Sequence, residues 1–306
     1  MRQTIFTILL FISAAIALVS CRKDRYEPDI VQYDEDQITA YIKANNITGM
    51  VRDTSGIYYK IITPGTGSVI QYSDSISMVY GLKSFDNRYI ATDTILNHFE
   101  DFSGHIESDG HPYGLQLAVH NLLNHKGGIA RLLIPSHLAF GVAGTGSGSS
   151  QVTNSHIAGN QSLDYTIHII SDQDAYDQTV IKNYIGANGL TSMKQDPSGI
   201  WYSISTPGTG TVAITDSTTI TATFTLAMLN HTIVDQYNSD VGVSIDIPDI
   251  MRGMQIGLKK YATAGALITY IIPSSLAYRK TAHNSLVTIP ANSPLRYDIQ
   301  IIDVSP

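Results

Sequence analysis

Cysteine is nearly absent from this sequence, because its 306 residues include only one, Cys21. A chain with a single cysteine cannot close an internal disulfide, which excludes a fold stapled by disulfides. Charged residues are also scarce at 15%, the net charge is −7, and no run is rich in lysine and arginine. The basic surface that nucleic-acid binding requires is therefore missing, and we expect no nucleic-acid partner.

A short apolar segment opens the chain. Met1-Arg-Gln-Thr4 carries one positive charge, and residues 5–19 are almost wholly apolar. This length is typical of a signal-peptide core and short for a transmembrane helix. The segment ends in Leu18-Val-Ser-Cys21, which resembles a bacterial lipobox, in which the cysteine is acylated and becomes the first residue of the mature chain. We therefore predict a signal peptide over residues 1–20, lipid attachment at Cys21 and a polar tether over residues 21–33.

These features predict an exported protein held by a lipid anchor in a bacterial envelope membrane. An ordinary signal peptide with an incidental cysteine is the alternative.

The rest of the chain repeats itself. Residues 34–67 align without a gap on residues 177–210, and 19 of the 34 positions are identical. Each copy opens with apolar residues at helical spacing, and the acidic residues of Asp34-Glu-Asp36 favour a helix that begins there, because the N-terminal end of a helix is partially positive. The repeat predicts two domains, residues 34–171 and 172–306, each opened by a helix.

Three motifs follow in the second copy: Ile250–Leu258, Ile272–Tyr278 and Ile289–Val304. In this order and at this spacing they resemble the FKBP family of peptidyl-prolyl isomerases, whose motifs read V-I-x-G-W-x-x-G-L, I-P-x-x-L-A-Y-G and I-P-x-N-x-x-L-x-F-D-V. From Leu295 the apolar residues alternate, which indicates a strand with one face in a core. Several strands with one helical segment between them predict an α+β fold. The resemblance implies an antiparallel sheet wrapped around a short helix in each domain.

The resemblance also implies a reaction, the isomerisation of X-Pro bonds, which forms no covalent intermediate. It requires an apolar pocket with few polar groups, and it implies no cofactor and no metal. On matching positions it assigns the pocket carboxylate to Asp235 and the hydroxyl that bonds the substrate carbonyl to Tyr278. It assigns the apolar pocket to Phe224, Val234, Ile250, Met251, Met254, Ile289 and Tyr297. Val234 and Met254 stand where the family has Phe and Trp, and a plain core role is the alternative for all these residues.

The first copy departs further from the family pattern. It keeps the strand tyrosine, Tyr80, but Ala91 falls where the carboxylate is expected and Asp93 comes two residues late. Phe140 replaces the hydroxyl-bearing tyrosine. We predict that this domain is a degenerate copy with a binding or structural role. Six histidines of this half show no metal-ligand spacing and are interpreted as solvated loop residues: His98, His105, His111, His120, His125 and His137.

Three functions are compatible with these observations. The first is a lipid-anchored isomerase that acts in its second domain on proline-containing polypeptide clients and assists the folding of exported proteins. The second is a non-catalytic peptide-binding or chaperone module of the same fold. The third is a structural spacer without an open cleft. The pair Asp235 and Tyr278, set against Ala91 and Phe140, is the feature that favours the first.

Overall fold

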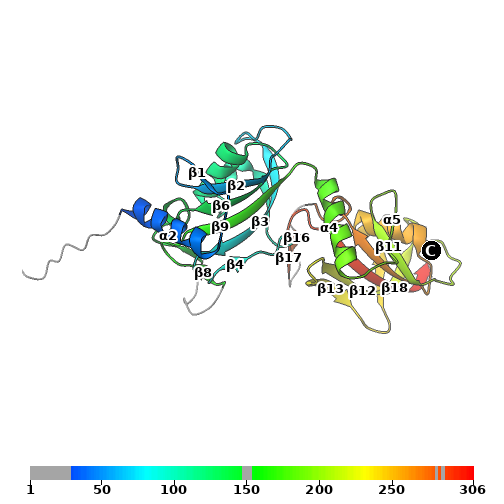
Figure 1. Cartoon of the computed structure of the whole chain (residues 1–306). Helices are drawn as coiled ribbons and strands as arrows, with labels where there is room; N and C mark the ends of the chain where they lie inside the picture. Colours follow the sequence, from blue (N-terminus) through cyan, green and yellow to red (C-terminus); the bar gives the residue numbers. More distant parts are fainter. Residues whose placement is uncertain (1–28, 147–153, 280–281, 284–286) are drawn as a thin grey trace, which may run out of the picture.

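The computed structural model of the chain describes residues 29–146, 154–279, 282–283 and 287–306 (Figure 1). Two antiparallel sheets of seven strands dominate it, one in each half of the chain, and a two-stranded ladder accompanies each. Helices are few and lie against the sheets. The arrangement is the α+β class that the sequence predicts.

The two sheets share one topology. The first has the order β1-β2-β6-β9-β3-β4, with β5 also on β3, and the second has the order β10-β11-β15-β18-β12-β13, with β14 also on β12. The first domain contains β1 Val51–Arg52, β2 Tyr58–Thr63, β3 Ser75–Ser84, β4 Ile90–Ala91, β5 His98–Phe102, β6 Ile129–Ile134 and β9 Leu163–Ile170, with the ladder β7 Thr145–Gly146 and β8 His156–Ile157. The second contains β10 Lys194–Gln195, β11 Trp201–Thr206, β12 Thr219–Met228, β13 Ile233–Tyr237, β14 Val243–Asp246, β15 Leu267–Ile272 and β18 Leu295–Ser305, with the ladder β16 Ala282–His283 and β17 Thr288–Ile289.

Alternation along β18 places one face of the second sheet in the core. Leu295, Tyr297, Ile299 and Ile301 are buried, whereas Gln300 between them is exposed. The strand lies between β12 and β15 and pairs with both. The strand that closes the second copy of the repeat is therefore central in its sheet.

One short helix packs against each sheet: α3 (Tyr113–Ala118), which continues into the π-helical turn η2 (Val119–Leu123), and α5 (Arg252–Tyr261). Each helix carries a glycine at its contact with the sheet. A Cβ at Gly253 would lie 2.4 Å from Cγ2 of Ile272, and one at Gly114 would lie 2.5 Å from Cγ2 of Ile134. Such distances are far below van der Waals contact, so only glycine lets the helix lie this close to the sheet.

A longer helix opens each domain: α2 (Ile30–Ala44) and α4 (Gln173–Ala187). The helices exist as predicted, but the expected start of the first one at Asp34 is wrong. It begins at Ile30, where the side chain of Asp29 accepts a hydrogen bond from Val31 N. The last residues of the predicted tether, 30–33, therefore belong to this helix.

The acidic residue that opens each copy of the repeat lies inside its helix and faces its own domain. The carboxylate of Asp34 accepts hydrogen bonds from Ser136 Oγ at 2.7 Å and from His137 N at 3.1 Å. The carboxylate of Asp177 accepts one from Ser274 N at 2.7 Å. Both carboxylates are thus committed to a tertiary contact, which is why they do not cap the helix N-terminus. The remaining short helical turns are η1 Ser103–His105, η3 Ser136–Leu138, η4 Ile247–Asp249 and η5 Ser274–Leu276.

The two domains contact each other through the loop that joins β4 to β5. The side chain of Ile95 in this loop packs against the core of the second domain. Asn230 Nδ2 donates to Asp93 Oδ2 at 2.6 Å. Beside this loop, Asn292 Nδ2 donates to Glu100 Oε2 at 2.5 Å. Figure 1 shows the β16–β17 ladder of the second domain reaching toward the first.

In the described part of the chain, every helix is too short or too polar to span a bilayer. The predicted signal peptide over 1–20 and the predicted lipid attachment at Cys21 lie outside the described residues, as does most of the tether.

Candidate active site

The structure gathers the residues that the family pattern singles out in the second domain. They come from strands β12, β13, β17 and β18, from helix α5 and from the segments next to α5 and η5. These residues are Phe224 on β12, Val234 and Asp235 on β13, Ile250 and Met251 before α5, Met254 on α5, Tyr278 after η5, Ile289 on β17 and Tyr297 on β18. They lie far apart in the sequence, and the sheet topology is what assembles them.

The apolar members form one packed group. Val234, Met254, Ile289 and Tyr297 are at most 7% exposed and belong to a single core cluster. Phe224, Ile250 and Met251 are partly buried and pack against that cluster. The ring of Phe224 stacks on Tyr297 with ring centroids 5.2 Å apart. The site therefore offers an aromatic and aliphatic surface, and the base of this surface is part of the hydrophobic core of the second domain.

The polar members lie at the edge of this group. Burial raises the pKa of Tyr278, and the Asp235 carboxylate raises it further. Burial raises the pKa of Tyr297 as well, with smaller contributions from Asp235 and then Tyr278. One carboxylate and two phenols therefore influence each other electrostatically. The Asp235 side chain is exposed and accepts a hydrogen bond from Gln236 N at 2.8 Å.

Tyr278 is accessible to a ligand. It is 39% exposed, and its hydroxyl forms no hydrogen bond with the residues that the structure describes. A neutral hydroxyl at the rim of an apolar surface can donate to a carbonyl that enters from solvent. Among the described residues no group of three or more His, Cys, Asp and Glu side chains is placed to hold a metal ion.

The strand register shows what the first domain has at the same positions. Leu226 on β12 lies opposite Asp235, and its counterpart Leu82 on β3 lies opposite Ala91. Ala91 therefore occupies the carboxylate position, as the sequence predicts. Phe140 likewise follows η3 as Tyr278 follows η5.

The nearby acidic residue of the first domain does not replace the missing carboxylate. One carboxylate oxygen of Asp93 accepts a hydrogen bond from Asn230 of the second domain, and the other oxygen accepts one of 2.8 Å from Ile95 N. It serves the contact between the domains.

The first domain nevertheless has an open cleft at the equivalent place. A cavity of about 420 Å³ is lined by Tyr80, Ala91, Phe140 and Tyr165, the counterparts of Phe224, Asp235, Tyr278 and Tyr297. Its wall also contains residues that the sequence did not single out as ligand-binding: Tyr89, Asn97, His98, Asp109, His111 and His156. The structural-spacer hypothesis, which needs no open cleft, is less well supported for this reason.

The interpretation of the histidines as solvated is wrong for most of them. His105 is exposed, but five are half-buried: His98, His111, His120, His125 and His137. Two of these, His98 and His111, line the cleft because β5 and the loop before α3 border it. The sequence shows that histidines are frequent in the first half of the chain, but only the fold shows which of them line the same cleft.

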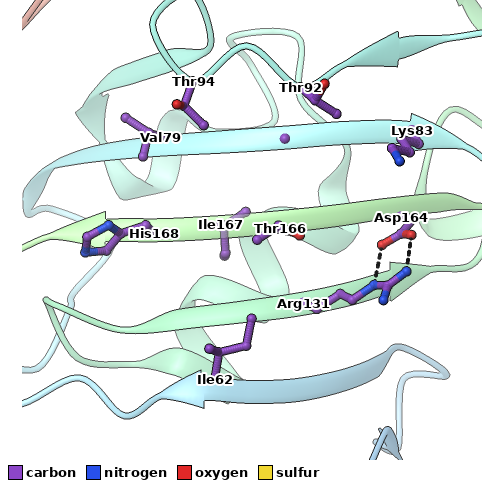
Figure 2. A pocket seen from close by; sticks show the side chains of 11 residues that line it. Ile62, Val79, Lys83, Thr92, Thr94, Arg131, Asp164, Thr166, Ile167 and His168 are labelled. Carbon is purple, nitrogen blue, oxygen red and sulfur yellow. Dashed lines mark hydrogen bonds and ion pairs between the residues drawn. The ribbon is translucent and has the colours of Figure 1, made fainter. Parts of the chain in front are cut away.

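A larger cavity, about 590 Å³, lies elsewhere. Figure 2 shows it on the face of the first sheet formed by β2, β6, β9 and β3, where Arg131 and Asp164 form an ion pair of 2.6 Å. Lys83, Thr92 and Thr166 line the same hollow. None of the residues predicted for substrate binding lines it.

Comparison with known proteins agrees with this geometry. A family model described as FKBP-type peptidyl-prolyl cis-trans isomerase matches residues 210–302. A protein of Buchnera aphidicola subsp. Acyrthosiphon pisum, named FKBP-type peptidyl-prolyl cis-trans isomerase FkpA, is 35% identical over 116 residues, which cover 38% of this chain and 46% of that protein. The protein of the same name from the subspecies Baizongia pistaciae is 25% identical over 224 residues, covering 68% of this chain and 83% of that protein.

Among solved structures, that of FkpA from Escherichia coli aligns with 42% of this chain and 58% of its own, at 26% identity and a TM-score of 0.36. The chain spans less than half the length of the first two curated relatives that it matches.

Proposed function

We propose that the second domain of this chain, in which residues 210–302 match a family model described as FKBP-type peptidyl-prolyl cis-trans isomerase, isomerises X-Pro bonds in polypeptide clients. The observation that supports this proposal is the apolar group that contains Phe224, Met254 and Tyr297, together with the electrostatic effect of Asp235 on Tyr278 and Tyr297. An amide bond isomerises without covalent chemistry, so a site of this kind needs shape and a few placed polar groups.

The physical route to catalysis is differential binding. The barrier to rotation about the peptide bond is about 18–20 kcal/mol, because rotation removes amide resonance. The prolyl ring would rest on the apolar surface, and the Tyr278 hydroxyl would donate to the substrate carbonyl. Such contacts lower the barrier only if they are stronger for the twisted amide than for the planar one. The Asp235 carboxylate would lie beside that amide.

The test is the isomerisation of one proline peptide by full-length variants. We expect Asp235→Ala to lower kcat/KM by about tenfold, equivalent to about 1.4 kcal/mol of transition-state stabilisation. Asp240→Ala is the matched control, because Asp240 is an exposed carboxylate just beyond β13 and does not belong to the site. If Asp235→Ala and Tyr278→Phe both leave the rate unchanged, the catalytic assignment is wrong.

A non-catalytic binding or chaperone role is the second candidate. It is favoured by Val234 and Met254, which replace the family's Phe and Trp and leave less aromatic surface for a prolyl ring. Methionine also adapts to partners of irregular shape. A protein that suppresses aggregation of an unfolded client but does not accelerate prolyl isomerisation would support this candidate over the first.

We further propose that the protein assists folding outside the cytoplasm while held to a membrane by an acyl group on Cys21. The support is the apolar segment over residues 5–19 followed by Leu18-Val-Ser-Cys21. Mass spectrometry of the mature N-terminus tests this directly. An unmodified mature N-terminus at another residue would refute the lipid anchor and leave the isomerase proposal untouched.

A further inference from the structure

The cleft of the first domain is lined by aromatic and polar residues. Its walls present aromatic rings, three of them tyrosines: Tyr80, Tyr89 and Tyr165. Tyr80 makes an edge contact with His111, with ring centroids 4.9 Å apart, and a tilted contact with Tyr165 at 6.0 Å. Phe140 completes the enclosure. At about 420 Å³ the cavity is large enough for a side chain or a small ligand.

A single acidic group marks this cavity. Asp109 is the only Asp, Glu, Lys or Arg among the described residues that line it. Its carboxylate lies close enough to raise the pKa of Tyr80, although burial is the larger cause and brings that pKa to about 12. The phenol is therefore neutral near pH 7.

Two of the three histidines that line the cavity, His98 and His111, do not offset this negative charge. Burial lowers the pKa of His98 and of His111, so both rings are neutral near pH 7. Asp109 opposes the shift of His111 but does not overcome it. Among the described residues, the cavity lining thus combines several aromatic rings with one carboxylate and contains neither lysine nor arginine.

We propose that this cleft binds a cationic side chain, lysine or arginine, of a polypeptide. A cation over the faces of tyrosine and phenylalanine rings is attracted by their quadrupoles, and a carboxylate at the rim adds direct attraction. The proposal does not depend on isomerase activity in either domain.

A second cavity next to the cleft favours a polypeptide as the occupant. It measures about 360 Å³ and shares His98 and Asp109 with the cleft. It continues past Glu100 and Asp101 to Pro290 of the second domain. A chain whose basic residue occupies the cleft can therefore run along an acidic groove toward the loop that borders the candidate active site.

The test uses the full-length chain and three capped pentapeptides, Ala-Ala-Xaa-Ala-Ala, in which Xaa is arginine, lysine or citrulline. Citrulline keeps the shape of arginine without its charge. We expect saturable binding of the arginine and lysine peptides by calorimetry and binding of the citrulline peptide that is about tenfold weaker. Equal binding of the arginine and citrulline peptides, or no saturable binding of either cationic peptide, overturns the proposal.

Variants locate the site. Asp109→Asn should weaken binding of the arginine peptide by about two- to fivefold, since the carboxylate is exposed. Glu107→Gln makes the same change of charge in the same exposed loop, outside the cavity lining, and should have no effect. Tyr89→Leu keeps an apolar group but removes a ring face and should also weaken binding. If Glu107→Gln matches Asp109→Asn, or Tyr89→Leu has no effect, the cleft is not the site.

Isomerisation of a proline peptide without basic residues should be unchanged in Asp109→Asn. This measurement separates the failure of one proposal from the failure of the other.

Discussion

The backbone amide of Ser274 donates a hydrogen bond of 2.7 Å to the buried carboxylate of Asp177, 97 residues earlier in the chain. This bond ties α4 to the turn that follows β15, and Tyr278 comes four residues after Ser274. The Asp34 carboxylate makes the equivalent contact with Ser136 in the first domain. The opening helix of each domain therefore supports the segment that carries the aromatic residue of its cleft.

Stability near this contact should depend on pH. Burial raises the pKa of Asp177, against hydrogen bonds from Ser274 and Gln173, so the folded pKa lies above the unfolded value of about 3.9. An acid with a raised folded pKa contributes stability at low pH, and that contribution is lost as pH rises from the unfolded pKa through the folded one. Asp177→Asn removes this titration. In urea unfolding from pH 3 to 7, the stability of the natural protein relative to the variant should fall as pH rises. A constant or increasing difference would contradict the assignment.

Removal of the Tyr278 hydroxyl should slow the reaction without abolishing it. Tyr278→Phe deletes one hydrogen bond to the substrate carbonyl, worth about 0.5–1.5 kcal/mol, so kcat/KM should fall several-fold. Phe140→Tyr in the first domain is the complementary change. It should bring no gain in isomerase rate, because Ala91 still leaves that cleft without the carboxylate. A gain in rate would mean that the first domain is catalytically competent.

Met254→Trp should tighten the binding of a prolyl peptide. Met254 is 1% exposed at the base of the apolar group, and an indole there adds aromatic surface under the prolyl ring. Because the larger ring has to fit a packed core, thermal unfolding of the variant should be measured with the Kd. An unchanged melting temperature with unchanged peptide binding would show that residue 254 does not contact the ligand.

A fragment of residues 172–306 should fold on its own. It contains α4 with its cap at Asp172, a complete seven-stranded sheet and its own core cluster. The fragment lacks Ile95 and the hydrogen bond from Asn230 to Asp93 of the first domain, so its free energy of unfolding should be lower. A single cooperative unfolding transition would support the predicted boundary, and a disordered fragment would refute it.

The sequence predicts well those features that local pattern determines. Alternation from Leu295 locates the central strand. The family pattern matches Ala91 to Asp235, and the structure pairs Ala91 with Leu82 as it pairs Asp235 with the counterpart Leu226. The two positions correspond even though the register of β12 and β13 shifts between Leu226 and Ala227.

The start of α2 and the exposure of the histidines were not predictable in this way. Asp34 looked like a residue of a helix N-terminus, and only the fold shows that Ser136 lies beside it. The local sequence around His98 and His111 is that of loop residues. Their burial depends on strands and loops that are distant in sequence, so the local pattern does not reveal it. Both misinterpretations concern polar residues whose partners come from elsewhere in the chain.

The anchoring of Asn292 has a consequence for substrate affinity. This residue is 8% exposed, and its amide donates to Glu100 and Ser77 of the first domain, while Ile289 three residues earlier belongs to the apolar group of the candidate active site. A segment that the other domain holds in place has lost its conformational entropy on folding, before a client binds. In the isolated fragment that entropy would be lost on binding instead, so KM should rise while kcat stays near its value in the whole protein.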